Sequence, residues 1–175
     1  MKKVLWFVLS FLVISNAHLF ATSGYEMKSY VGSAEFERLK GLAGTWKGIT
    51  TEMNGEKWDA TVEYSVTSNG SAVVEKLFSG TSHEMVSVYY DKKGKPSMTH
   101  YCGLANRPQL SLVSSNDHEI QFVFSNSNDI DPAKEMHMHA LKLTFDGKDK
   151  LVQDWKLFKD GTEAGSTIIA LTRQS

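Results

Sequence analysis

Hydrophobic and polar residues alternate with a period of two along most of the chain after residue 45. This period is typical of β-strands that bury one face and solvate the other. Ten segments carry it, and we expect their ends to be correct to within a few residues. These segments are residues 45–53, 57–67, 71–79, 83–91, 96–103, 108–115, 118–125, 135–146, 149–159 and 165–174.

Turn-forming pairs separate these segments at short, regular intervals. Asn-Gly occurs at 54–55 and 69–70, and Asp-Gly at 146–147 and 160–161. Such pairs favour tight hairpins between antiparallel strands. Because closure removes the exposed edges of a sheet, the sequence predicts an all-β fold, a single up-and-down antiparallel β-barrel of about ten strands.

One short helix is expected before the strands. Ser33 is a suitable N-cap, apolar residues recur at three-residue spacing as Phe36, Leu39 and Leu42, and Gly41 favours termination. We expect this helix to cap one end of the barrel.

The N-terminus predicts export. Lys2 and Lys3 precede an apolar run, Val4 to Ile14, that is too short to span a bilayer but typical of a signal peptide. Cleavage is expected after Ala17, with Ala21 as the second choice, and no cysteine lies nearby to carry a lipid anchor. The expected organisation is a signal peptide over 1–17, a flexible lead-in over 18–32 and a barrel domain over 33–175.

Composition limits the partners. Cleavage leaves about 158 residues, enough for one domain with a sizeable core. Loss of the two N-terminal lysines leaves 17 basic and 20 acidic side chains, a formal charge of −3. This charge argues against nucleic-acid binding, and Cys102 alone forms no internal disulfide. We expect a secreted or periplasmic protein, free of the membrane after cleavage, and a monomer or weak homodimer.

Parity within the strands identifies side chains that should line the interior. On 57–67, Trp58 and Tyr64 share the apolar face, and Phe122 and Trp155 do the same on their strands. A barrel of about ten strands leaves room for a ligand among such side chains.

His137 and His139 fall on the same parity as the apolar residues Leu141 and Leu143, so both imidazoles are expected to face inward. One interpretation places them near a rim or in hydrogen bonds with neighbouring strands. The other makes them ligand contacts, or ligands to a metal or haem iron.

His100 and Cys102 share one face of their strand, opposite Tyr101. If that face is interior, both side chains would join His137 and His139 in a nitrogen and sulfur set suited to zinc. If it is exterior, Tyr101 lines the cavity instead. Parity leaves the two arrangements open.

Catalytic signatures are weak. The sequence has no Gly-x-Ser-x-Gly, and the adjacent His83 and Glu84 alternate to opposite faces. We expect a binding protein rather than an enzyme, with catalysis by the interior polar cluster as an alternative.

The chain resembles the calycin superfamily, which includes lipocalins, fatty-acid-binding proteins and nitrobindin-like barrels, and also uncharacterised secreted bacterial proteins. The calycin resemblance is carried by Gly44-Thr45-Trp46 at the first strand and Arg173 in the last. The resemblance to the bacterial proteins is carried by Thr99-His100-Tyr101-Cys102 with Asn106 and Pro108. The calycin resemblance implies that Arg173 packs across Trp46, which makes Gly44, Trp46 and Arg173 structural residues. It also implies a small, mostly apolar ligand in the interior.

The sequence therefore predicts an exported barrel that binds a small hydrophobic or amphipathic molecule, with no resident cofactor. The alternative is a haem or zinc protein that uses His137 or His139. The expected ligand contacts are Trp58, Tyr64, His100, Tyr101, Phe122, His137, His139 and Trp155.

Overall fold

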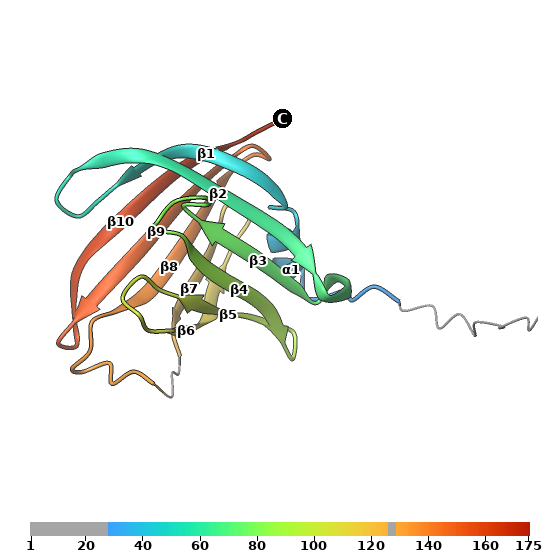
Figure 1. Ribbon diagram of the computed structural model, residues 1–175. Coiled ribbons are helices and arrows are strands. Elements are labelled where there is room, and N and C mark those ends of the chain that lie inside the picture. The colour runs from blue at the N-terminus through green and yellow to red at the C-terminus, as the bar shows by residue number, and fades with distance from the viewer. Residues whose placement is uncertain (1–27, 126–128) are drawn as a thin grey trace, which may run out of the picture.

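The computed structural model describes residues 28–125 and 129–175, so the predicted signal peptide lies outside the described part of the chain. A short helix precedes ten strands (Figure 1). Their bounds are α1 (Ala34–Lys40), β1 (Gly44–Thr51), β2 (Lys57–Thr67), β3 (Ala72–Leu77), β4 (Met85–Lys92), β5 (Lys95–Tyr101), β6 (Gln109–Ser115), β7 (Glu119–Phe124), β8 (His137–Asp146), β9 (Lys150–Lys159) and β10 (Thr162–Arg173).

The strands form a closed antiparallel barrel in which each strand pairs with its sequence neighbours and β1 pairs with β10. The predicted fold class is confirmed. Closure brings the two strands very close at Gly48, where an added Cβ would lie 1.8 Å from the carbonyl oxygen of Ala170. Only glycine fits at this position, so Gly48 allows the seam to close.

Helix α1 closes one end of the barrel, which we call the closed end. The side chain of Ser33 accepts a hydrogen bond from the backbone N–H of Phe36 at 3.3 Å, as expected of an N-cap. Phe36 and Leu39 are buried in the barrel core. Within residues 28–125 and 129–175, no helix is long and apolar enough to cross a membrane.

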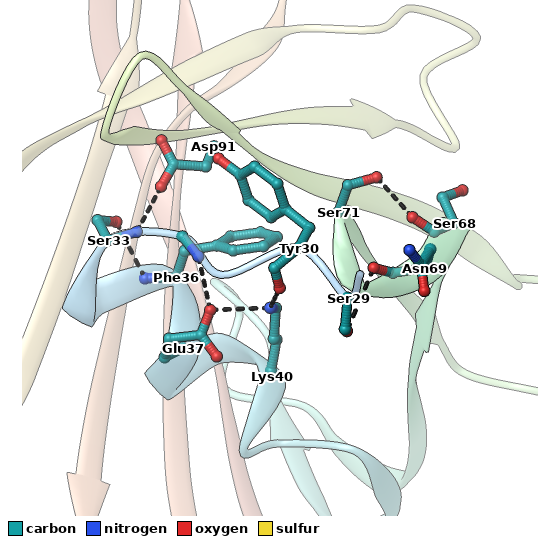
Figure 2. A network of polar contacts seen from close by, with 11 residues as sticks. Ser29, Tyr30, Ser33, Phe36, Glu37, Lys40, Ser68, Asn69, Ser71 and Asp91 are labelled. Carbon is teal, nitrogen blue, oxygen red and sulfur yellow. Dashed lines mark hydrogen bonds and ion pairs between the residues drawn. The ribbon is translucent and has the colours of Figure 1, made fainter. Parts of the chain in front are cut away.

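The residues just before α1 are attached to the barrel (Figure 2). The backbone N–H of Tyr30 donates to the carbonyl of Asn69 at 2.9 Å, and the ammonium of Lys40 donates to the carbonyl of Tyr30 at 2.7 Å. The backbone N–H of Ser33 donates to Asp91 at 2.6 Å. The lead-in is thus held to the β2–β3 turn and to β4 from residue 28 onward.

Trp46 and Arg173 are directly opposed across the seam between β1 and β10. The guanidinium lies 4.3 Å from the centre of the indole ring, the expected cation–π contact. Its two terminal nitrogens donate to the carbonyls of Ala43 and Gly41 at 2.7 Å each. Arg173 therefore ties the last strand to the end of α1.

Candidate functional site

The interior is filled near α1 but leaves a chamber of about 110 Å³ toward the opposite end, which we call the open end. The chamber's walls come from the open-end parts of the strands and their connections. Its lining residues are Glu52, Leu77, Phe78, Met85, His100, Met138, Trp155, Thr167 and Ile169. Most of these side chains are apolar, so the few polar atoms decide what the chamber recognises.

Four residues with inward-facing side chains form a polar row across adjacent strands. Tyr64 on β2 is opposed to Glu75 on β3, Glu75 to Ser87 on β4, and Ser87 to His100 on β5. All four are buried. Since strands in a barrel are tilted, this row runs from beside Gly44, the partner of Tyr64, to the chamber at His100.

The carboxyl group of Glu75 lies fully buried among donors. The hydroxyl of Tyr64 donates to Oε1 at 2.6 Å, and the hydroxyl of Tyr89 donates to Oε2 at 3.1 Å. Ser87 is directly opposed to Glu75 on the neighbouring strand. Burial raises the pKa of Glu75, while these hydrogen bonds act in the opposite direction. Surrounding a carboxyl with donors favours the ionised form, which only accepts.

Gln153 on β9 completes the surroundings of Glu75 from the other wall. Its Nε2 donates to Oε1 of Glu75 at 2.7 Å and to the hydroxyl of Tyr64 at 2.6 Å. Its Oε1 accepts from the indole N–H of Trp155 at 2.9 Å. Because an indole nitrogen only donates, Trp155 fixes the orientation of this amide.

His100 joins the polar row to the chamber. Its Nδ1 lies 3.0 Å from the hydroxyl oxygen of Ser87, and its ring packs on Trp155 with centroids 4.6 Å apart. Burial lowers the pKa of His100 to about 4, so the imidazole is neutral near pH 7. In the described part of the chain, Nε2 has no hydrogen-bond partner, and His100 lines the chamber.

A second polar group stands at the mouth of the chamber. Glu52 accepts from the indole N–H of Trp58 at 3.2 Å and from the hydroxyl of Thr167 at 2.8 Å. Among the described lining residues there is no lysine or arginine. The chamber thus presents a carboxylate and an imidazole without a compensating cation.

His137 and His139, expected to face the interior, do not line the chamber, and β8 contains a bulge beside them. Met138 is opposed to Leu157, whereas the next paired residue, Ala140, is opposed to Lys156. His139 is the extra residue, and the alternation shifts by one position. Met138 therefore lines the chamber, whereas His137 is paired with Phe158, is fully buried and does not line the chamber.

The two histidines form an aromatic cluster of their own. Nε2 of His137 lies 3.0 Å from Nδ1 of His139, and Nδ1 of His137 lies 2.8 Å from the carbonyl oxygen of Glu135. His139 stacks on Phe158 at 3.9 Å, and Phe124 contacts both imidazoles. The hydrogen bonds of the two imidazoles thus stay within residues 135–139, and the neighbouring strands β7 and β9 contribute ring contacts.

The ambiguity on β5 is resolved with His100 inside. Tyr101 is 50% exposed and lies on an outer groove rather than in the chamber. Cys102 also lines that groove, and burial raises the pKa of its thiol. Within the described residues, no three histidine, cysteine or acidic side chains are close enough to hold a metal ion together. His100, Cys102 and the β8 histidines therefore do not form the zinc set considered from the sequence.

The other predicted lining residues divide between core and chamber. Trp155 lines the chamber, Tyr64 belongs to the polar row, and Phe122 packs edge-on against Tyr89 with centroids 5.8 Å apart. Trp58 stands at the mouth, where it packs on Phe78.

Sequence reasoning missed Glu75, Ser87, Met138 and the mouth residues Glu52 and Thr167. Alternation carried a usable signal for Glu75, because it stands between Val73 and Leu77 on a buried face. A carboxyl group at such a position requires interior partners.

Larger hollows lie on the outer surface, and two of them exceed 600 Å³. One, of about 630 Å³, is the groove beside Tyr101, and the other, of about 690 Å³, lies beside Trp46 and Arg173. At Arg173 the guanidinium nitrogens already bond to carbonyls. The smaller interior chamber is therefore the better candidate, since it combines apolar walls with a convergent polar group.

No family model matches the chain, and no curated protein matches it by sequence. Among solved structures, a protein of unknown function from the DUF3598 family of Nostoc punctiforme is similar, with a TM-score of 0.55 and 13% identity. The match covers 78% of this chain and 49% of that protein, so this chain spans about half the length of its structural relative. At this identity the likeness concerns the fold alone.

A redesigned β-barrel also matches, with 15% identity and a TM-score of 0.38, over 78% of this chain and 95% of that one.

Proposed function

We propose that this protein is a calycin-like binding barrel that holds a small hydrophobic or amphipathic molecule in its open-end chamber. The observation that carries the proposal is the chamber of about 110 Å³, whose mostly apolar walls converge on a single imidazole. An engineered cavity of about 150 Å³ binds benzene, so a chamber of this size suits a ligand of few heavy atoms or one end of a longer molecule.

The mouth allows such a ligand to enter. Met85, Met138 and Thr167 line the chamber and are only partly buried, so the lining continues to the surface. Met85 and Met138 are unbranched side chains that adapt to different shapes. We expect them to move when a ligand is bound.

A pair of tryptophan substitutions tests the proposal. Phenol and fluorobenzene are titrated separately into the ¹⁵N-labelled protein, and chemical-shift changes are followed by NMR. We expect at least one compound to shift resonances around the chamber in the wild type. Met138→Trp fills the chamber and should weaken that binding at least tenfold. Met136→Trp, just before the same strand and outside the chamber, should leave the binding unchanged. Shifts confined to the outer surface, or equal binding by Met138→Trp, would refute the chamber as the binding site.

Export of the mature barrel belongs to the same proposal and rests on the apolar run from Val4 to Ile14 that follows two lysines. Mass spectrometry of the protein recovered from the native host should give an N-terminus after Ala17 or Ala21. Recovery of the uncleaved chain in the cytosol would contradict export.

Haem or zinc binding through His137 or His139, and catalysis by the interior polar groups, stay predictions. A Soret band that appears on haem titration and is lost in His137→Ala would favour the first over the organic ligand.

A further inference from the structure

His100, the last residue of the polar row, lines the chamber, and its free nitrogen determines which chemical group of a ligand can bind there. This inference rests on the proposed binding function and extends it to the class of ligand. The decisive question is whether Nε2 of His100 carries a proton. In a neutral imidazole one nitrogen donates and the other accepts.

The hydrogen bonds of the row assign that proton. Trp155 fixes the Gln153 amide so that its NH₂ group faces the Glu75 carboxyl. Gln153 and the hydroxyls of Tyr64 and Tyr89 donate to the Glu75 carboxyl, so Glu75 serves as an acceptor. Ser87 is directly opposed to Glu75, which puts this acceptor within reach of the serine hydroxyl.

Ser87 has one proton to give. Hydrogen bonds to a carboxylate are stronger than those to a neutral acceptor, so this proton goes to Glu75. The serine oxygen then accepts from His100, whose Nδ1 lies 3.0 Å away. Nδ1 is therefore protonated, and Nε2 is left as a bare acceptor.

Among the described residues that line the chamber, none offers Nε2 a free hydrogen-bond donor. The lining consists of apolar side chains together with Trp155, Thr167 and Glu52, and the Trp155 N–H and the Thr167 hydroxyl already donate to Gln153 and Glu52. An acceptor in an apolar chamber favours a ligand that brings a donor. Glu52 at the mouth disfavours an anion such as a carboxylate.

We propose that the chamber selects small neutral molecules with an apolar body and one O–H or N–H donor, such as a phenol or a short alcohol, and that the donor bonds to Nε2 of His100. Glu75 and Ser87 are positioning residues that act through the tautomer of His100. The hydrogen bonds in the core thus determine which nitrogen of His100 is protonated, and so which group of the ligand it can bind.

Three matched probes test the selectivity in the wild-type protein. Phenol and fluorobenzene have nearly the same shape, but only phenol donates a hydrogen bond, and benzoate carries a negative charge. We expect phenol to bind about tenfold more tightly than fluorobenzene, as one hydrogen bond of about 1.4 kcal/mol implies, and benzoate to bind more weakly than either. Equal affinity for phenol and fluorobenzene would overturn the inference and leave the binding function intact. Binding of neither would refute both.

A second measurement reads the tautomer without any ligand. The ¹⁵N spectrum of the protein labelled at histidine should show His100 with a protonated Nδ1 and an unprotonated Nε2, and addition of phenol should shift the Nε2 resonance. A protonated Nε2 in the free protein would overturn the inference even if the chamber binds both aromatic probes.

Substitutions separate positioning from packing. His100→Phe keeps a ring against Trp155 and should abolish the preference for phenol over fluorobenzene. Ser87→Ala should reduce that preference and alter the His100 tautomer. Ser97→Ala is the matched control, since Ser97 is another buried serine, bonded to Ser111 at 3.3 Å and outside the chamber lining. If Ser97→Ala changed the preference as much as Ser87→Ala, the assigned role of Ser87 would be wrong.

Discussion

The two ends of this barrel use polar groups in different ways. At the closed end Arg173 lies over Trp46 and donates to backbone carbonyls that end α1. At the open end His100 is held by Ser87, yet its other nitrogen has no hydrogen-bond partner in the described part of the chain. Satisfied polar groups stabilise a fold, whereas a held but unsatisfied group is a means of recognition. On the proposed function, the closed end therefore serves stability and the open end serves binding.

Substitution of Trp46 should have the largest effect on the stability contributed by the closed end. Trp46 is fully buried, and Trp46→Ala deletes its packing, its cation–π contact and the hydrogen bond from its indole nitrogen to the carbonyl of Leu42 at 2.8 Å. We expect the free energy of unfolding to fall by about 3–5 kcal/mol in urea denaturation. If the variant stays folded, its preference for phenol should be unchanged. A loss below 1 kcal/mol would contradict the assignment of stability to this end.

The pH dependence of stability should reveal His100. Its pKa is about 4 in the folded protein and 6.5 ordinarily, so between these pH values the unfolded chain binds a proton that the folded protein does not. Unfolding free energy should therefore fall as the pH falls from 6.5 to 4, by about 3 kcal/mol over the window.

Glu75 should change the unfolding free energy with pH in the direction opposite to His100. Burial raises its pKa, so its contribution to stability declines as the pH rises above its ordinary value of 4.5. Comparison with His100→Phe in urea titrations at several pH values isolates the histidine, because only the wild type should show its acid-induced loss. Parallel pH profiles for the two proteins would argue against a neutral buried His100.

Arg173 provides a finer test of the closed end. Arg173→Ala removes the cation–π contact and the bonds to Ala43 and Gly41, and should cost about 1–3 kcal/mol of unfolding free energy. Arg173→Lys keeps the charge but loses the planar fork, and we expect it to recover less than half of that loss. Thermal unfolding of both variants measures the difference. Full recovery by lysine would show that charge alone matters.

The smallest effect is expected at the mouth. Thr167→Val removes the hydroxyl that donates to Glu52 but preserves shape, and Glu52 keeps its bond from Trp58 in a partly exposed position. Stability should change by less than about 1 kcal/mol. A larger loss in chemical denaturation would mean that the open end also contributes to the stability of the fold.

Local patterns were sufficient to predict the architecture. Alternation and turn pairs predicted ten strands, Ser33 marked the start of α1, and the short motif at Trp46 and Arg173 predicted the seam. These predictions are correct because each depends only on residues close in the sequence or on the first and last strands, which must meet when the sheet closes. The strand ends differ from the expected ones by only a few residues.

The site depended on information that alternation lacks. Glu75 is tolerated only because partners from β2, β4 and β9 converge on it, and no local pattern specifies that convergence. On β8, either parity offered apolar and polar side chains, so the bulge at His139 left no clear trace in the sequence.

That bulge also determines how many nitrogen donors the chamber contains. In an unbroken register His139 would oppose Leu157 and share the interior with His100, and two converging imidazoles are the beginning of a metal site. The extra residue places the thioether of Met138 there instead. If the proposed function is right, one inserted backbone residue leaves His100 as the chamber's single imidazole, suited to an organic hydroxyl or amine.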